Sequence, residues 1–512
     1  MNQPDRESTD VDVVVVGGGP AGSTVASFVA KQGGRVLLLE KETFPRYQIG
    51  ESLLPSTTQW ICGLLGVADE VEAAGFQTKT GGTFLWGASP KPWSFTFATA
   101  SHRGRHAFQV ERMKFDKILL DNARRLGVDV REQCAVKDVV SDPDRVRGVT
   151  YTDAGGAEHT VTARFVVDAS GNSSRIRRHV GGTRELAEYF RNIAVFGYFE
   201  GGKRMDPPLR GNILCAAFGG GWFWYIPLTD ELTSVGAVVP ADMVDKIQQD
   251  REAALTQFIG ESPMISDFLT DARRVTEGPY GEVRVRKDYS YSNTRFWRPG
   301  MALVGDAACF VDPLFSTGVY LATYSGLLAA RSINSVLAGQ VEEQRAFAEA
   351  EFRHRREYNL YYEFLKAVYD THQDETSYFW TAKKLTGGTA SEADSFSYLT
   401  AGLGAGEYTP VDGGPGAPDA AARSRGRGPD EDAAMRAFWQ GRTEEFTTEH
   451  HPDPNHLRLD DGNHQRLLRT IEEGWRARPD RLTVSGDSMY WQEPEPEPEP
   501  ETAISAPAPG AG

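Results

Sequence analysis

The chain has few cysteines. Only four occur among its 512 residues, Cys62, Cys134, Cys215 and Cys309, and no two of them have C-x-x-C spacing. A disulfide framework or a structural zinc site needs paired cysteines at close, regular spacing. The sequence therefore predicts neither a disulfide-stabilised secreted domain nor a metal site, and the four thiols are expected to be reduced core residues.

The chain also lacks long apolar runs and an excess of positive charge. No apolar stretch reaches the roughly 20 residues that a membrane-spanning helix needs, and the mean hydropathy is -0.42. The polar N-terminus does not resemble a signal peptide, which favours a cytoplasmic protein. The net charge of -16 argues against nucleic acid as a partner, because phosphate binding requires a basic surface. Small molecules or proteins remain as partners.

The N-terminal segment has the pattern of a βαβ unit. The β-branched run Asp10–Val16 predicts a strand, Ser23–Lys31 has helical periodicity, and Arg35–Leu39 predicts a second strand. Between the first strand and the helix lies Gly17–Gly22, which has the spacing G-x-G-x-x-G. This order of strand, glycine turn, helix and strand is typical of a dinucleotide-binding domain.

Specific residues of this unit are candidates for contacting a dinucleotide. Gly17, Gly19, Ala21 and Gly22 allow a tight turn that brings a pyrophosphate close to backbone N–H groups at a helix N-terminus. Glu40 ends the second strand 18 positions after Gly22 (40 minus 22), where a carboxylate can accept both ribose hydroxyls. The alternative, a glycine turn without a ligand, is disfavoured by the acid at this spacing.

Strands predominate in the first part of the chain and helices follow them. The predicted strands are Val128–Arg131, Val146–Thr152 and Phe165–Asp168, and the predicted amphipathic helices are Gly318–Leu337 and Glu342–Leu365. The aromatic-rich region Asn192–Val239 is expected to form a separate mixed sheet. Two groups of strands with different composition predict two interleaved domains within one core.

The composition changes near residue 385. Gly402–Gly428 is rich in Gly, Ala, Pro and Arg and too poor in large apolar residues to form a core. We therefore expect a core over residues 1–385 and a C-terminal region over 386–512, with a linker and short helical patches. The alternation of Glu and Pro near the end predicts that residues 492–512 are disordered.

The most distinctive motif is the hexamer Trp222–Pro227, W-x-W-x-I-P, which follows the glycine run Gly219–Gly221. In a strand Trp222 and Trp224 face the same side, so both could simply be core residues. Placed downstream of the dinucleotide turn, however, the motif resembles that of the flavin-dependent halogenases. In that family the two indoles separate halogenation from oxygenation, and here the resemblance assigns that role to Trp222 and Trp224.

Two later motifs resemble those of the aromatic hydroxylase class of flavoproteins. They are Asp168-Ala169-Ser170-Gly171 and Gly305-Asp306-Ala307-Ala308. The resemblance implies FAD, with Asp306 at the ribityl chain, Arg112 near the flavin and the Val136 backbone at adenine. It also implies an α/β fold in which a Rossmann-like FAD-binding domain is interleaved with a mixed β-sheet substrate domain, followed by a helical and partly disordered C-terminal tail.

No second nucleotide fingerprint follows a strand elsewhere in the sequence. This is compatible with FAD arriving as FADH2 from a separate flavin reductase. In the halogenase family the flavin hydroperoxide formed with O2 is attacked by chloride or bromide, which gives a hypohalous acid. The resemblance implies the same chemistry here.

Three further segments match the family's halogenation residues. Lys79 matches its lysine, which receives hypochlorous acid; the alternative is a solvated loop lysine. Thr317 and Gly318 match its chloride site; the alternative is a helix cap made by the side chain of Ser316 or Thr317. Glu51, in a segment that resembles the flavin strap, is expected to link the flavin to the halide site.

The substrate expected from these resemblances is a phenol. Tryptophan halogenases have Glu where this chain has Phe315, and three segments are similar to halogenases of tyrosyl residues in peptide antibiotic biosynthesis, namely residues 47–55, 196–204 and 285–291. The implied product is chlorinated ortho to the phenolic hydroxyl, on a substrate tethered to a peptidyl or acyl carrier protein. Arg353–Arg356 is a candidate basic patch for the carrier; the alternative is a solvated helix face.

The sequence thus predicts an FADH2-dependent halogenase of a tyrosine-like ring. Two other functions remain open at this point. One is an FAD-dependent aromatic hydroxylase with the same fold, and the other is a non-catalytic flavoprotein scaffold.

Overall fold

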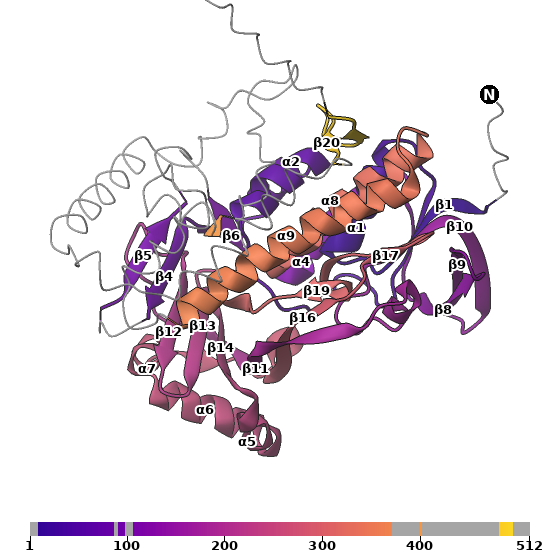
Figure 1. The fold of residues 1–512 in the computed structure, drawn as a ribbon. Helices are drawn as coiled ribbons and strands as arrows, with labels where there is room; N and C mark the ends of the chain where they lie inside the picture. The colour runs from indigo at the N-terminus through magenta and orange to yellow at the C-terminus, as the bar shows by residue number, and fades with distance from the viewer. Residues whose placement is uncertain (1–8, 87–90, 98–105, 371–399, 402–480, 495–512) are drawn as a thin grey trace, which may run out of the picture.

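The computed structural model describes residues 9–86, 91–97, 106–370, 400–401 and 481–494. These residues form two large sheets joined by long helices, with two further two-stranded sheets (Figure 1). The predicted α/β architecture, with an FAD-type parallel sheet interleaved with a mixed sheet, is confirmed. None of the helices in the described ranges has the length and apolar character that crossing a membrane requires.

The first sheet is built around the N-terminal strand. Its main path is β17-β18-β10-β1-β2-β7, and β8 and β9 extend it from β10. The strands are β1 (Val11–Val16), β2 (Val36–Leu39), β7 (Asp129–Arg131), β8 (Ala135–Ser141), β9 (Val146–Thr152), β10 (Glu158–Asp168), β17 (Trp297–Arg298) and β18 (Met301–Leu303). β1 pairs in parallel with both β10 and β2, and Val13–Val15 are fully buried. An uninterrupted apolar run suits a strand covered on both faces.

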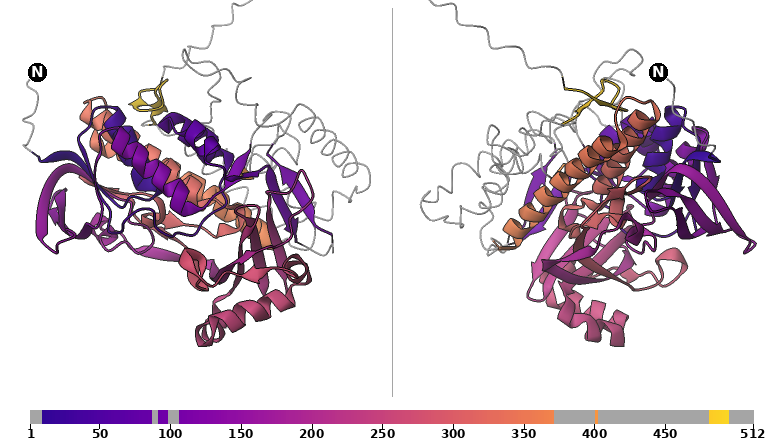
Figure 2. Two further views of the ribbon diagram at one scale, coloured as in Figure 1. Left: turned by 180° about the vertical axis from the view of Figure 1, so that it is seen from behind. Right: turned by 45° about the vertical axis from the view of Figure 1, so that its right-hand side comes forward.

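Helices cover this sheet and bring distant parts of the chain to the glycine turn. The helices of this part are α1 (Pro20–Lys31), α2 (Cys62–Leu65), α3 (Ala68–Ala73) and α4 (Arg112–Arg125), with a π-helical turn at Ser56–Ile61. α1 contacts both α4 and α8 (Gly318–Leu337). α8 has the predicted bounds, and α9 (Glu343–Asp370) runs beside it, five residues past the predicted end at Leu365 (370 minus 365) (Figures 1 and 2).

The second sheet contains the tryptophan motif. Its order is β19-β16-β11-β14-β13-β12-β4-β5, with β15 paired to β11. The strands are β4 (Gly81–Leu85), β5 (Trp93–Thr96), β11 (Arg184–Glu200), β12 (Ile213–Phe218), β13 (Gly221–Pro227), β14 (Leu232–Pro240), β15 (Arg273–Arg274), β16 (Arg284–Asn293) and β19 (Cys309–Phe310). A separate two-stranded sheet pairs β3 (Gln77–Lys79) with β6 (Ala107–Gln109).

The alternation of side chains along β13 places its residues in two different cores. Phe223 and Tyr225 belong to the cluster that includes Phe258 of α6 (Arg251–Glu261), which lies with α5 (Val244–Gln249) and α7 (Pro263–Phe268) at the lower end of the molecule (Figures 1 and 2). Trp222 and Trp224 belong to the main core on the opposite face. The prediction that both tryptophans face one side is therefore confirmed.

The last described segment packs back onto the long helices. β20 (Thr483–Val484) pairs with β21 (Trp491–Gln492), shown in yellow in Figure 1. The Trp491 indole is buried and donates to Ser332 Oγ at 2.9 Å, and Arg353 Nη2 donates to the Leu482 carbonyl at 2.8 Å. Gln492, which the sequence places in the disordered end, lies in β21. Residues 495–512 and the linker at 402–428 lie outside the described residues.

The proposed basic patch on α9 is wrong for Arg353 and His354. Arg353 and His354 are buried, and Arg353 Nε forms an ion pair with Glu349 at 2.7 Å. Burial lowers the pKa of His354 to about 3, so its imidazole is neutral. Arg355 bonds Glu351 and the Asn293 carbonyl. Arg353 and His354 face the core. They therefore belong neither to a carrier-docking patch nor to a solvated helix face.

Candidate active site

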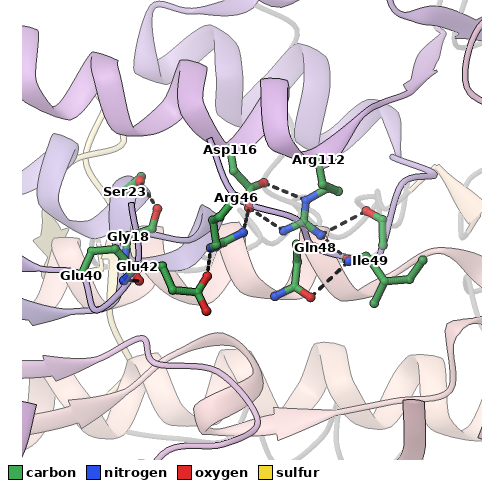
Figure 3. Close-up of polar contacts among 10 residues, drawn as sticks. Gly18, Ser23, Glu40, Glu42, Arg46, Gln48, Ile49, Arg112 and Asp116 are labelled. Atoms are coloured by element: carbon green, nitrogen blue, oxygen red, sulfur yellow. Dashed lines mark hydrogen bonds and ion pairs between the residues drawn. The ribbon is translucent and has the colours of Figure 1, made fainter. Parts of the chain in front are cut away.

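The turn between β1 and α1 has no room for a Cβ at Gly17 or Gly22. Gly17 has a φ of +103°, and a Cβ on Gly22 would lie 1.9 Å from the Gly17 carbonyl oxygen. Gly18 N–H donates to Glu40 Oε2 at 2.7 Å and Glu42 N–H donates to Glu40 Oε1 at 2.8 Å (Figure 3). The turn thus holds the carboxylate of Glu40 beside the N-terminus of α1, which is the arrangement that a dinucleotide needs.

Two arginines near this turn share one buried carboxylate. Arg46 Nη1 lies 3.0 Å from Asp116 Oδ2, and Arg112 Nε lies 2.7 Å from Asp116 Oδ1 (Figure 3). Arg112 Nη1 also donates to the Ile49 carbonyl at 2.6 Å. Arg46 approaches Gly19, since a Cβ there would lie 3.4 Å from its guanidinium. Arg46, which no sequence motif indicated, therefore supplies positive charge where a pyrophosphate would lie.

One cavity of about 1040 Å³ runs between the two sheets. This volume is at the upper end for ligand sites and suits an extended dinucleotide. The predicted site residues that line it are Gly17, Gly19, Ala21, Glu40, Glu51, Arg112, Val136, Trp222, Trp224, Asp306 and Gly318. Gly22, Lys79 and Thr317 are not among its lining residues. The glycine turn, the cationic donors and the ribose-type acid together fit FAD.

Two carboxyl groups in this cavity are partly or fully withdrawn from solvent. Burial raises the pKa of Asp306, which the nearby Arg286 and Arg112 oppose. Glu51 is buried, and burial raises its pKa to about 7, which the nearby Ser234 hydroxyl and the hydrogen bond from Tyr198 oppose. Glu51 is therefore an acid that gains and loses a proton near neutral pH.

The two tryptophans form one wall of the cavity. Their ring centroids are 6.4 Å apart and both rings are buried. Trp224 Nε1 donates to Ser234 Oγ at 3.2 Å, and Trp222 Nε1 donates to Tyr369 Oη at 2.6 Å. A Cβ on Gly236 would lie 2.3 Å from the Trp224 ring, so the glycine makes room for this indole. The wall is thus held rigidly by bonds from β14 and α9.

Lys79 is buried at the end of β3 and is not a solvated loop lysine. Its Nζ donates to Ser52 Oγ at 2.8 Å and to the Leu53 carbonyl at 3.0 Å, and it lies 5.5 Å from the centre of the Phe97 ring. Burial lowers the pKa of Lys79 to about 7, which Cys215 opposes. Because Ser52 lines the cavity, the amine is one hydrogen bond away from it.

The turn before α8 presents free backbone donors. Ser316 has a φ of +60°, and neither Thr317 nor Gly318 donates its backbone N–H to another described residue. Thr317 is the N-cap residue of α8, but neither Ser316 nor Thr317 makes a side-chain capping hydrogen bond. The Thr317 hydroxyl is buried and also has no hydrogen-bond partner among the described residues. Unpaired N–H groups at a helix N-terminus suit an anion such as halide.

Asp312 connects this turn to the tryptophan wall. Its Oδ1 accepts the Leu314 N–H at 3.1 Å, and its Oδ2 accepts Asn192 Nδ2 at 3.1 Å and Tyr369 Oη at 3.2 Å. Tyr369 in turn accepts the indole N–H of Trp222. Burial raises the pKa of Asp312 to about 6. Sequence reasoning missed this connection because its members are far apart in the chain.

Several known proteins are similar to this chain in sequence. A family model described as tryptophan halogenase matches residues 12–105 and 99–404. The tryptophan 2-halogenase of Chondromyces crocatus is 36% identical over 376 residues, which are 73% of this chain and 70% of the relative. The 1H-pyrrole-2-carbonyl-[peptidyl-carrier protein] brominase of Pseudoalteromonas luteoviolacea is 34% identical over 65% of this chain and 79% of its own length.

Solved structures show the same likeness. The structure of the myxobacterial chondrochloren halogenase CndH, described as a variant of FAD-dependent halogenases, superposes with a TM-score of 0.73. It is 46% identical and the match covers 94% of this chain and 99% of that one. The flavin-dependent brominase Bmp2 has a TM-score of 0.67 at 28% identity, over 77% of this chain and 93% of its own.

Proposed function

This chain belongs to the tryptophan halogenase family of flavin-dependent enzymes, and from that premise we propose that it chlorinates a phenolic, tyrosine-like ring tethered to a carrier protein. The single observation that carries the substrate class is Phe315, an apolar residue beside the halide turn where a tryptophan halogenase has Glu. We further propose a cytoplasmic enzyme that receives reduced flavin from a separate reductase.

We propose that residues lining the cavity bind FAD. Gly17, Gly19 and Ala21 present the α1 N-terminus to the pyrophosphate, with Gly22 keeping the turn tight and Glu40 accepting the ribose hydroxyls. The Val136 backbone binds adenine, while Arg112 and Asp306 face the flavin and its ribityl chain. When bound and reduced, FAD supplies with O2 and halide an electrophilic halogen as hypohalous acid.

The Thr317–Gly318 turn holds the halide. Its two N–H groups have no other partner among the described residues and lie at the positive end of the α8 dipole. The buried Asp312 carboxyl lies on the same turn, and its pKa of about 6 sets how much negative charge it carries. Trp222 and Trp224 keep the aromatic substrate out of the flavin cavity, which disfavours direct oxygenation.

Lys79 receives the hypohalous acid and presents it to the substrate. With a pKa of about 7 the amine is about half neutral at neutral pH, so it can either bond the acid or react with it. The bonds from Nζ to Ser52 and Leu53 fix its position. A positioned amine places the halogen at one ring carbon, whereas free hypohalous acid would attack any reactive group.

The surroundings of Phe315 are apolar, which suits a phenol. Phe315 is buried and stacks on Phe364 with ring centroids 4.6 Å apart, and Phe84 lies 6.1 Å from it. A phenolic oxygen donates electron density to its own ring and directs attack to the ortho carbon, so no carboxylate is needed to activate that ring. Carrier tethering is supported by the 34% identical relative, which acts on a carrier-bound pyrrole.

An indole is the second candidate, because a relative that is 36% identical is a tryptophan 2-halogenase. The test is a competition assay in which the enzyme, a flavin reductase, NADH, FAD and chloride are given equal concentrations of free tryptophan, free tyrosine and a carrier-bound tyrosyl group. We expect the carrier-bound tyrosyl group to be chlorinated and free tryptophan to remain unchanged, as measured by mass spectrometry. Preferential chlorination of tryptophan would contradict the phenol assignment.

A further inference from the structure

Glu51 is the buried end of a hydrogen-bonded chain whose other end, Tyr47, is partly exposed and also lines the cavity. Its Oε1 accepts Tyr198 Oη at 2.8 Å, and Tyr198 Oη lies 2.7 Å from Tyr47 Oη. Its Oε2 is buried and has no hydrogen-bond partner among the described residues. Because Glu51 also lines the cavity, this free oxygen is available to a group bound there.

The direction of each bond in the chain follows from proton counting. A phenol has one proton, and Tyr198 gives its proton to Glu51. The bond between the two tyrosines therefore runs from Tyr47 to Tyr198. Tyr47 is partly exposed, whereas Tyr198 is buried. All donors point from the more exposed end toward the Glu51 carboxylate.

The reaction of this enzyme family consumes protons inside the cavity. In balanced form, anionic reduced flavin, dioxygen, halide, an aromatic C–H compound and two protons give oxidised flavin, the aryl halide and two water molecules. The two protons in this balance come from solvent, whereas the Glu51 side chain is itself buried. A fixed proton path to Glu51 meets this requirement.

We propose that Tyr47 and Tyr198 form a proton relay that recharges Glu51 during halogenation. Glu51 gives the proton on Oε2 to an oxygen atom, derived from dioxygen, that leaves as water. Oε1 then takes the proton of Tyr198. Tyr198 takes the proton of Tyr47, solvent reprotonates Tyr47, and rotation of the Glu51 carboxyl returns the proton to Oε2. This proposal rests on the flavin-dependent halogenation in the proposed function. It does not require the substrate to be a phenol.

The surroundings of the chain favour this role. The Glu51 pKa of about 7 allows both protonation states near neutral pH. Arg112 opposes the rise in that pKa and Glu111 adds to it, while the Arg284 guanidinium lies 3.9 Å from the centre of the Tyr47 ring. Burial raises the pKa of both tyrosines, so each acts as a neutral hydroxyl that passes protons on.

Tyr280 offers a matched control. Its ring centroid lies 4.5 Å from that of Tyr198, but its hydroxyl donates to Glu111 Oε1 at 3.0 Å and is not part of the relay. Tyr280→Phe and Tyr198→Phe thus each remove one buried hydroxyl from the same aromatic group. Only the second breaks the chain to Glu51.

The experiment measures the Glu51 proton and the reaction rate in the FAD-bound enzyme. In the oxidised holoenzyme the infrared band of the protonated Glu51 carboxyl, identified by its loss in Glu51→Gln, is expected to titrate with a midpoint above that of an exposed glutamate. Tyr198→Phe removes a hydrogen bond to the charged form and therefore moves this midpoint upward. Tyr280→Phe leaves it in place.

The rates complete the test. At saturating FAD, Tyr198→Phe and Tyr47→Phe are expected to slow halogenation by about 100-fold, the usual contribution of a positioned proton donor, while Tyr280→Phe keeps the wild-type rate. The relay is refuted if both relay variants halogenate at the wild-type rate, or if Tyr280→Phe slows the reaction equally. An unmoved midpoint in Tyr198→Phe refutes it as well.

Discussion

Lys79→Ala is expected to lower the formation of halogenated product by about 1000-fold, while reduced flavin and oxygen are still consumed. The reason is that Lys79 does not line the FAD cavity, so its removal leaves the flavin site intact. Without the amine, hypohalous acid has no group that holds it near the substrate ring and it escapes into solution. Product is measured by mass spectrometry, and flavin reoxidation by absorbance.

The controls separate this role from packing and from charge. Lys79→Met keeps most of the buried volume and is expected to lose halogenation equally. Lys246→Ala removes another lysine whose amine lies over an aromatic ring, 4.7 Å from the centre of the Phe258 ring. Lys246 and Phe258 lie in α5 and α6. This variant should halogenate at the wild-type rate. If Lys79→Met retains halogenation, the amine has no part in the mechanism.

Gly22→Ala is expected to weaken FAD binding by at least about 100-fold, or about 2.7 kcal/mol. The added Cβ would lie 1.9 Å from the Gly17 carbonyl oxygen and 3.2 Å from the Ala169 Cβ. Gly17 and Ala169 directly follow β1 and β10, so the clash can be relieved only by moving backbone away from its present position. The N-terminus of α1 would then no longer face the pyrophosphate. Quenching of FAD fluorescence on titration with protein measures the affinity.

The control for this variant is Gly63→Ala. A Cβ on Gly63 has no atom within 4 Å, and the residue lies in α2. Alanine is favoured over glycine in a helix by about 1 kcal/mol, so this variant should fold and bind FAD like the wild type. Wild-type affinity in Gly22→Ala would show that the turn does not bind the pyrophosphate.

The sequence was sufficient to predict features that depend on neighbouring residues. The glycine turn, the alternation of Trp222 and Trp224 in β13, and the bounds of α8 follow from spacing and periodicity over a few residues. Each of these patterns has one backbone geometry that satisfies it. These patterns were enough to predict where the FAD cavity lies and that the two tryptophans form one of its walls.

Contacts between distant segments could not be predicted in this way. Tyr198 is 147 positions from Glu51, and Tyr369 is likewise 147 positions from Trp222. The burial of Arg353 depends on the segment that contains β20 and β21. The carbonyl that it bonds, that of Leu482 just before β20, lies 129 positions further along the chain. A charged run on a helix predicts a solvated face only when no later segment packs on it.

The most direct test of the halogenase assignment is the mass spectrum of the product that the wild-type enzyme forms from a carrier-bound tyrosyl group, with flavin reductase, NADH, FAD and chloride. One chlorine isotope pattern is expected on the ring, and it should disappear when chloride is omitted. A product heavier by oxygen alone, or an unmodified substrate with flavin reoxidised identically with and without halide, would contradict it.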